Sequence, residues 1–128
     1  MSIIKVDYGE MSGGNVKSGI EADTAYGQDL VINTGLSEIT HFAFHSRDKA
    51  SGQYNPVIFY DKNIASDKYL GFTVSGAGVG YGNYNLSIGA VASAGNIALK
   101  SINGGTVTVT MPNVSWQAVQ TDIHWFAD

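Results

Sequence analysis

The feature that most constrains the fold is segment 98–111, which carries the clearest β-hairpin signal in the sequence. Asn103, Gly104 and Gly105 tolerate positive φ, so they suit the turn of a hairpin. Residues 106–111 alternate strictly between polar and apolar, which is the pattern of a strand with one buried face. The segment therefore predicts an antiparallel β domain, although none of its residues performs chemistry.

Two registers of this hairpin can be compared. A two-residue loop, 103–104, places Lys100 opposite Val107 and so mixes a solvent residue with a core residue. A three-residue loop, 103–105, keeps the apolar and polar residues on separate faces. It makes three apolar-side pairs: Ile97 with Met111, Leu99 with Val109, and Ser101 with Val107. We predict this second register, with Gly105 in the left-handed conformation.

Length and composition describe one β-rich domain held together by packing. The chain has 128 residues, which is enough for a substantial core without disulfides or metal, and it contains no cysteine. Charged residues make up 14% of the chain, against about 25% in an average soluble domain. The surface is therefore expected to be mostly Ser, Thr, Asn, Gln and Tyr. Such a surface suits packing against copies or binding neutral, hydroxyl-rich ligands.

Charge and hydropathy exclude several classes of partner. The net charge is -4 and there is no basic run, which argues against a nucleic-acid role based on phosphate neutralisation. Residues 1–7 lack the apolar core of a signal peptide, and no segment approaches the length of a membrane span. We therefore expect no nucleic-acid partner, no membrane insertion, and assembly in a cytoplasm.

The first 28 residues differ from the rest. A short apolar start, 3–8, runs into Gly13-Gly14 and then Ser18-Gly19, with few large apolar residues after Met11. This composition predicts an N-terminal arm and linker over 1–28, followed by a β domain over 29–128. The alternative is that 3–8 is an edge strand of the same sheet.

The sequence of residues 29–128 predicts short strands separated by turns. Apolar or alternating runs occur at 30–32, 39–46, 57–60, 69–74, 86–91, 97–111 and 115–127, of which 86–91 is either a strand or one turn of helix. The glycine-dense stretch 76–85 is predicted to be a loop. The fold class that follows is an all-β antiparallel sandwich, jelly-roll-like, with seven or eight short strands.

The alternation also predicts which side chains face inward. In 69–74 the inward face is predicted to carry Leu70, Phe72 and Val74. The centre of the core is expected to contain these residues: Phe42, Phe44, Phe72, Leu99, Val109 and Trp125.

No constellation of residues supports catalysis or metal binding. His41 and His45 would lie about 13 Å apart on a strand, too far to hold one ion together. The acidic residues of 61–67 lack the pattern of an EF-hand, so a solvated turn is the better interpretation. The glycines of 76–82 lack the strand and helix that a dinucleotide fingerprint needs. We predict a non-enzymatic protein with no metal and no cofactor.

The remaining candidate for binding is a set of aromatic and amide residues in predicted loops. Exposed rings flanked by amides can stack on sugars and bond their hydroxyls, and they are also favoured at protein interfaces. A third interpretation is that the rings cover the ends of the sandwich. The residues are Tyr54, Asn55, Tyr81, Asn83, Tyr84, Asn85 and Trp116.

Several short stretches resemble a known group of proteins. They are Ile-Ile-Lys-Val-Asp-Tyr-Gly at 3–9, Asn-Thr-Gly-Leu-Ser at 33–37, Ile-Asn-Gly-Gly-Thr-Val at 102–107, and the ending Trp-Phe-Ala at 125–127. Together they resemble small structural proteins of tailed phages and prophages of Gram-positive bacteria. The ending is also similar to the last strand of H-type lectins, but no binding residue carries over from that likeness.

The resemblance implies a virion component, either a tail or receptor-binding module or a capsid decoration module. We expect it to self-associate, to attach to other virion proteins through its N-terminal arm, and to reside in the virion. The alternative is a lectin-like carbohydrate-binding module that recognises a cell-surface glycan with Tyr81, Tyr84, Trp116 and neighbouring amides.

Overall fold

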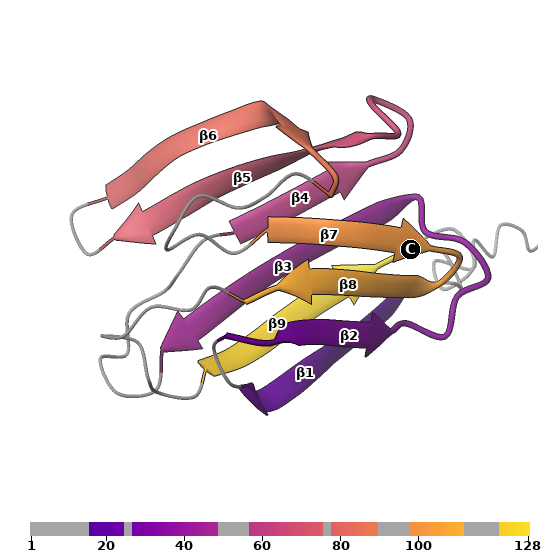
Figure 1. Cartoon of the computed structure of the whole chain (residues 1–128), viewed down its shortest axis with the longest axis horizontal. Coiled ribbons are helices and arrows are strands. Elements are labelled where there is room, and N and C mark those ends of the chain that lie inside the picture. The colour runs from indigo at the N-terminus through magenta and orange to yellow at the C-terminus, as the bar shows by residue number, and fades with distance from the viewer. Residues whose placement is uncertain (1–15, 25–26, 49–56, 76–77, 90–97, 112–120) are drawn as a thin grey trace, which may run out of the picture.

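The fold is an all-β sandwich of two antiparallel sheets (Figure 1). The computed structural model describes residues 16–24, 27–48, 57–75, 78–89, 98–111 and 121–128, and for 23, 46–48, 72–75, 78–85 and 121 it describes the backbone alone. The strands are β1 (Lys17–Thr24), β2 (Asp29–Asn33), β3 (His41–Asp48), β4 (Val57–Asp61), β5 (Lys68–Ser75), β6 (Gly78–Ser87), β7 (Ala98–Asn103), β8 (Thr106–Thr110) and β9 (Thr121–Ala127).

The two sheets differ in size. The large sheet has six strands in the order β1-β9-β3-β4-β5-β6, and the small sheet has three in the order β2-β8-β7. In Figure 1 the small sheet lies over the β1, β9 and β3 part of the large sheet, while β5 and β6 extend past it. The predicted sandwich is confirmed, but the described residues form nine strands rather than seven or eight.

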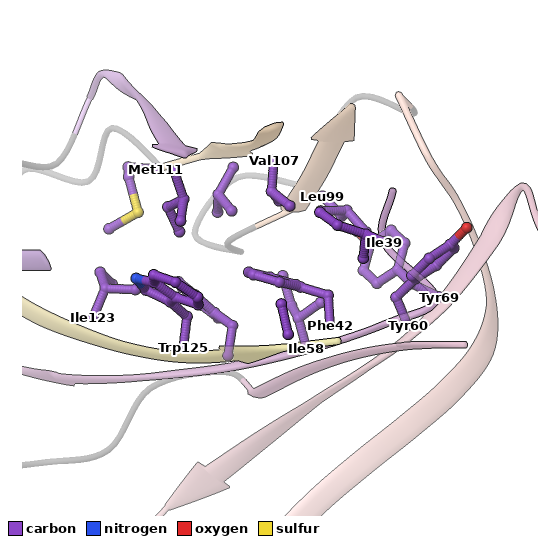
Figure 2. Packing of buried hydrophobic residues seen from close by; sticks show 14 residues of the cluster. Ile39, Phe42, Ile58, Tyr60, Tyr69, Leu99, Val107, Met111, Ile123 and Trp125 are labelled. Atoms are coloured by element: carbon purple, nitrogen blue, oxygen red, sulfur yellow. The ribbon is translucent and has the colours of Figure 1, made fainter. Parts of the chain in front are cut away.

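The core fills the space between the sheets. Figure 2 shows Leu99 and Val107 of the small sheet facing Phe42, Ile58 and Trp125 of the large sheet. The rings of Phe42 and Phe44 stack with their centroids 6.4 Å apart. Each such side chain contributes about 1.5–3 kcal/mol when it is fully buried. The predicted core residues are confirmed except for Phe72, whose side chain lies outside the described part of the chain.

The β7–β8 hairpin is confirmed, but its predicted turn is wrong. Leu99 lies opposite Val109 as predicted, whereas Ser101 lies opposite Thr108 and Asn103 opposite Thr106. The loop therefore has two residues, 104–105. A register shift between Leu99 and Ser101 then brings Leu99 opposite Val109, as predicted. Positive φ lies at Gly104, with a value of 58°, and not at Gly105.

The turn is shaped by the loop that follows β2. The Thr34 side chain donates to the Gly105 carbonyl oxygen at 2.6 Å, and the Thr34 N–H donates to the same oxygen at 3.0 Å. A Cβ atom on Gly105 would lie 1.7 Å from the carbonyl oxygen of Leu36. Gly105 is therefore needed because another backbone passes against it.

Two further predictions are corrected. Most of the stretch predicted as a loop, 76–85, belongs to β6, which pairs with β5 along its length. The inward face of β5 is also reversed near its start, since Tyr69 is buried in the core and Leu70 lies opposite Phe59 on the other face. The alternation of 69–74 shows two faces, but it does not show which one meets the small sheet.

The large sheet includes part of the segment predicted as arm and linker. β1 pairs with β9 from Lys17 opposite Ala127 to Thr24 opposite Thr121, so these residues form an edge strand. Residues 1–15 lie outside the described part of the chain. The arm, and the division of the chain into 1–28 and 29–128, stay predictions.

Candidate functional site

The outer face of the large sheet, which points away from the core, carries a row of side chains that are apolar except for one serine. Cross-strand register places Ser18, Phe126, Ala43, Phe59 and Leu70 next to one another across β1, β9, β3, β4 and β5. We call these five residues the outer row. Alternation within each strand decides which residues face outward, and strand pairing decides which of those residues become neighbours.

The outer face of the large sheet exposes large apolar side chains in and beside the outer row. The Phe126 residue is 43% exposed, and Ile20, two residues along β1 from Ser18, is 60% exposed. The outer face of the small sheet is different, since Val31, 53% exposed, is its large exposed hydrophobic residue among those described. Its outward positions are mostly polar and include Asp29, Asn33, Lys100, Ser101, Asn103, Thr106, Thr108 and Thr110. The two outer faces therefore differ in chemistry.

Two histidines lie beside the outer row. His45 of β3 and His124 of β9 are opposite each other in register, and His124 is opposite Ile20 of β1. Their rings are stacked with centroids 4.8 Å apart and planes at 1°. Burial, and then the neighbouring His124, lower the pKa of His45 below its ordinary value. The neutral form of His45 is therefore favoured in the folded chain.

The third histidine lies between two carboxylates at the end of the same face. His41 Nδ1 is 2.6 Å from Asp128 Oδ1, and His41 Nε2 is 3.4 Å from Asp61 Oδ2. The hydrogen bond to Asp128 raises the pKa of His41, and the charges of Asp128 and Asp61 add to that rise against the lowering effect of burial. Because the two ring nitrogens point to different carboxylates, the arrangement is an ion-pair clamp.

A pocket of about 460 Å³ opens at the same end of the sandwich. Figure 1 shows the β2–β3 loop, the β4–β5 turn and the β7–β8 turn at the same end of the sandwich. Ile39, Ile88, Ile102 and Tyr60 supply the apolar part of the lining, and the polar part comes from Glu38, Lys62, Ser66 and Asp67, with Gly104 alongside. Lys62 pairs with Glu38, and Lys68 pairs with Asp67 at 3.0 Å. The pocket thus combines an apolar lining with charges that are already neutralised.

The side chains of the residues predicted as a binding platform lie outside the described part of the chain. Tyr54, Asn55 and Trp116 lie outside the described residues, and Tyr81, Asn83, Tyr84 and Asn85 are described only as backbone of β6. Their role stays a prediction. Within the described ranges no three His, Cys, Asp or Glu residues are placed to hold a metal ion. Those ranges also contain no helix long and apolar enough to cross a membrane.

Sequence reasoning missed the outer row, the histidine stack and the His41 clamp. The sequence does place His41, Ala43 and His45 on one strand face. It does not show that His124 and Phe126 pair with that face, because β9 lies about eighty residues further along the chain. One pattern in the sequence could have indicated the outer row. In the last strand Trp125 lies on the predicted inner face, so the adjacent Phe126 points to the opposite face although it is apolar.

Comparisons with known proteins give one distant likeness. No protein-family model and no curated protein matches the chain. Among solved structures, the chain is similar to the tailspike protein of Acinetobacter phage vB_ApiP_P1, with a TM-score of 0.37 and 20% sequence identity. The similarity covers 89% of this chain and 21% of that one, so the chain spans about a fifth of the length of the tailspike.

Proposed function

We propose that this protein is a non-enzymatic structural module of a phage particle that acts by self-association through the outer face of the large sheet. The phage assignment rests on the short stretches at 3–9, 33–37, 102–107 and 125–127 that resemble phage structural proteins. The association rests on one observation, which is the outer row with its exposed Phe126 beside Ile20.

A sheet with apolar side chains on both faces needs cover on both faces. The small sheet covers the inner face, whereas Phe126 of the outer row is 43% exposed among the described residues, which suits burial against a partner. At the end of this face the charge of His41 is compensated, because its ring nitrogens lie 2.6 Å from Asp128 and 3.4 Å from Asp61. A face of this kind does not repel its own copy, and a symmetric dimer uses the same patch on both subunits. A second copy of the chain is therefore the fitting partner.

Measuring mass in solution tests this proposal, for example by light scattering coupled to gel filtration. The wild-type chain is expected to give a multiple of 13.6 kDa, and Phe126→Asp is expected to give 13.6 kDa. Val31→Asp is the matched control, because it adds the same charge at an exposed apolar position on the other sheet. A wild-type monomer at high micromolar concentration, or equal masses for Phe126→Asp and wild type, would overturn the proposal.

The second candidate is binding of a neutral carbohydrate, and the pocket at the end of the sandwich favours it. Its apolar lining suits the C–H face of a sugar ring, while Ser66 and the Glu38–Lys62 pair offer groups for hydroxyls. Both charged pairs at the rim are internally compensated, so a neutral ligand fits better than an ionic one. The predicted platform residues on β6 would be a separate surface for the same class of ligand.

A glycan array tests the second candidate. Ser66→Tyr places a bulky ring at the pocket wall, and Asn63→Tyr places the same ring in the same turn away from the lining residues. We expect wild type and Asn63→Tyr to give the same signal and Ser66→Tyr to lose it. Absence of any signal from wild type would exclude this candidate and leave the self-association proposal unaffected.

A further inference from the structure

We propose that a second copy of the chain joins at β1, which pairs with the partner's β1 in the antiparallel direction about Gly19, so that the large sheet continues across both copies. This inference rests on the proposed self-association and adds its geometry. The outer row alone indicates that copies associate, but it does not say how they are aligned.

The free side of β1 offers a template for one more strand. Within the described ranges β1 lies at the end of the large sheet and pairs with β9 alone. Sheet edges are commonly protected by prolines, by short strands or by bulges. β1 has eight residues and no proline, and its register shift comes after Glu21, so 17–21 is paired regularly with β9. This regular stretch suits the addition of a strand by backbone hydrogen bonds.

The charges of β1 favour its own copy as the added strand. Lys17 and Glu21 share one face of β1, but four residues of extended chain hold them about 13 Å apart, too far to pair with each other. Antiparallel pairing about Gly19 places Lys17 of each copy opposite Glu21 of the other. Opposite charges in directly opposed positions stabilise strand pairing. The two-fold symmetry of the pairing makes this contact twice.

Glu21 is already oriented on that face. The indole Nε1–H of Trp125 donates to Glu21 Oε1 at 3.3 Å, which ties the Glu21 side chain to β9. A carboxylate accepts several hydrogen bonds, so this contact is compatible with a lysine on the partner's strand. Part of the ordering cost of the ion pair is therefore met before the copies meet.

The same register extends the outer row. It places the partner's Ile20 opposite Ser18, and Ser18 lies opposite Phe126 of β9. Ile20 is 60% exposed and Phe126 is 43% exposed in a single copy. Only the short serine side chain stands between the two large apolar side chains, so each copy gains an apolar neighbour for its Phe126. A charge at position 126 therefore weakens this contact too, as the proposed function requires.

Disulfide cross-linking tests the register. The chain contains no cysteine, so introduced thiols report proximity directly. Ser18→Cys and Ile20→Cys chains are mixed under reducing conditions, oxidised, and analysed by mass spectrometry. The proposed pairing puts these two Cα atoms about 4.5–5.5 Å apart, which a disulfide can bridge. We expect the mixed 18–20 disulfide to be the main cross-linked product. Ile20→Cys mixed with Val31→Cys, an exposed position on the small sheet, reports chance collisions.

Charge reversal tests the ion pairs. Lys17→Glu places like charges opposite each other twice, and we expect the dissociation constant to rise about tenfold. Adding Glu21→Lys to Lys17→Glu restores opposite charges in the symmetric pair and is expected to restore association. Sedimentation velocity measures the three proteins, and circular dichroism reports whether each is folded.

The outcomes separate this inference from the proposed function. A dominant mixed disulfide together with rescue by the double charge reversal supports the inference. If wild type associates but the mixed disulfide is no more frequent than in the control, or Ile20→Cys alone cross-links best, the inference is overturned and the proposed function stands. If the mixed disulfide forms only after removal of residues 1–15, that segment occupies the edge, and the inference is overturned. If a cysteine variant does not fold, absence of rescue by the double charge reversal overturns the inference. A wild-type monomer overturns the proposed function and this inference with it.

Discussion

The rings of His45 and His124 lie parallel across β3 and β9, with centroids 4.8 Å apart and planes at 1°. They are 79 positions apart in the sequence (124 − 45), and strand pairing alone brings them together. Both rings lie on the outer face of the large sheet, beside the exposed Phe126. The outer face therefore carries an aromatic histidine pair and an exposed apolar residue in neighbouring register positions.

His41 should make the fold less stable as pH rises. Its pKa in the folded state is raised above 6.5, mainly by the hydrogen bond to Asp128, so its stabilising effect is complete below pH 6.5. The effect is lost as pH rises through the raised value. The difference in melting temperature between wild type and His41→Gln is therefore expected to shrink from pH 5.5 to pH 8.5. A difference in melting temperature that does not change with pH would contradict the ion-pair clamp between His41, Asp128 and Asp61.

His45 should have the opposite effect. Its pKa in the folded state lies below 6.5, so the unfolded chain binds the proton more readily as pH falls below that value. His45→Gln is expected to reduce the loss of stability between pH 6.5 and pH 5.0, compared with wild type. Thermal melts at low protein concentration, where the chain is dissociated, separate this effect from association. An identical acid-side slope in both proteins would show that His45 does not titrate with folding.

Gly105→Ala should destabilise the hairpin turn strongly. The added methyl would meet the carbonyl oxygen of Leu36 at 1.7 Å, so one of the two backbones must move, at a cost of about 1–3 kcal/mol. Gly104→Ala is the comparison, because its φ of 58° strains an alanine by about 1–2 kcal/mol but its Cβ clears the Ser37 carbonyl oxygen at 3.4 Å. Urea unfolding measures both free energies. A smaller loss for Gly105→Ala than for Gly104→Ala would contradict the close approach of the two loops.

Leu99→Ala should be among the most damaging substitutions in the small sheet. Leu99 is fully buried opposite Val109, and its truncation leaves a cavity that costs about 2–5 kcal/mol. Ile64→Ala, at a position 64% exposed in the β4–β5 turn, is expected to change the free energy of unfolding by less than about 0.5 kcal/mol. Equal effects of the two substitutions would mean that the sandwich core is placed wrongly.

Removal of residues 1–15 should separate folding from attachment. β1 begins at Lys17, so this deletion leaves every described strand intact. If 1–15 acts as the predicted arm, the truncated chain should keep its melting temperature and its mass in solution but lose incorporation into particles. Mass spectrometry of purified particles from a strain that carries the truncated gene measures this. Unchanged incorporation would remove the arm from the proposed function.

Much of the fold follows from local sequence pattern. The alternation around Phe42 and Phe44 and in 106–111 identifies strands and their buried faces, because side chains on a strand point alternately to two sides. The sandwich class follows from many short strands with turn residues between them. These are local properties, and the structure agrees with them at Phe42, Phe44, Leu99, Val109 and Trp125.

The candidate site was much less accessible from sequence. Leu70 and Phe126 are apolar residues that face outward, and a pattern of alternate apolar residues cannot show which of two apolar faces is covered. The platform residues are predicted as aromatic and amide residues of loops, yet four of them belong to the glycine-rich strand β6. Glycine weakens a strand, but pairing with β5 overrides that local preference.

The sequence by itself determined that the chain forms β-strands, where most of them lie, and that Phe42, Phe44, Leu99, Val109 and Trp125 belong to the core. Tertiary structure alone decided that β1 borders β9, that His124 meets His45, and that Gly105 lies under the backbone of Leu36. The reason is physical: alternation is set within a few residues, whereas strand order and turn geometry depend on contacts between segments far apart in the chain. The outer row depends on these long-range contacts, because its residues come from five different strands.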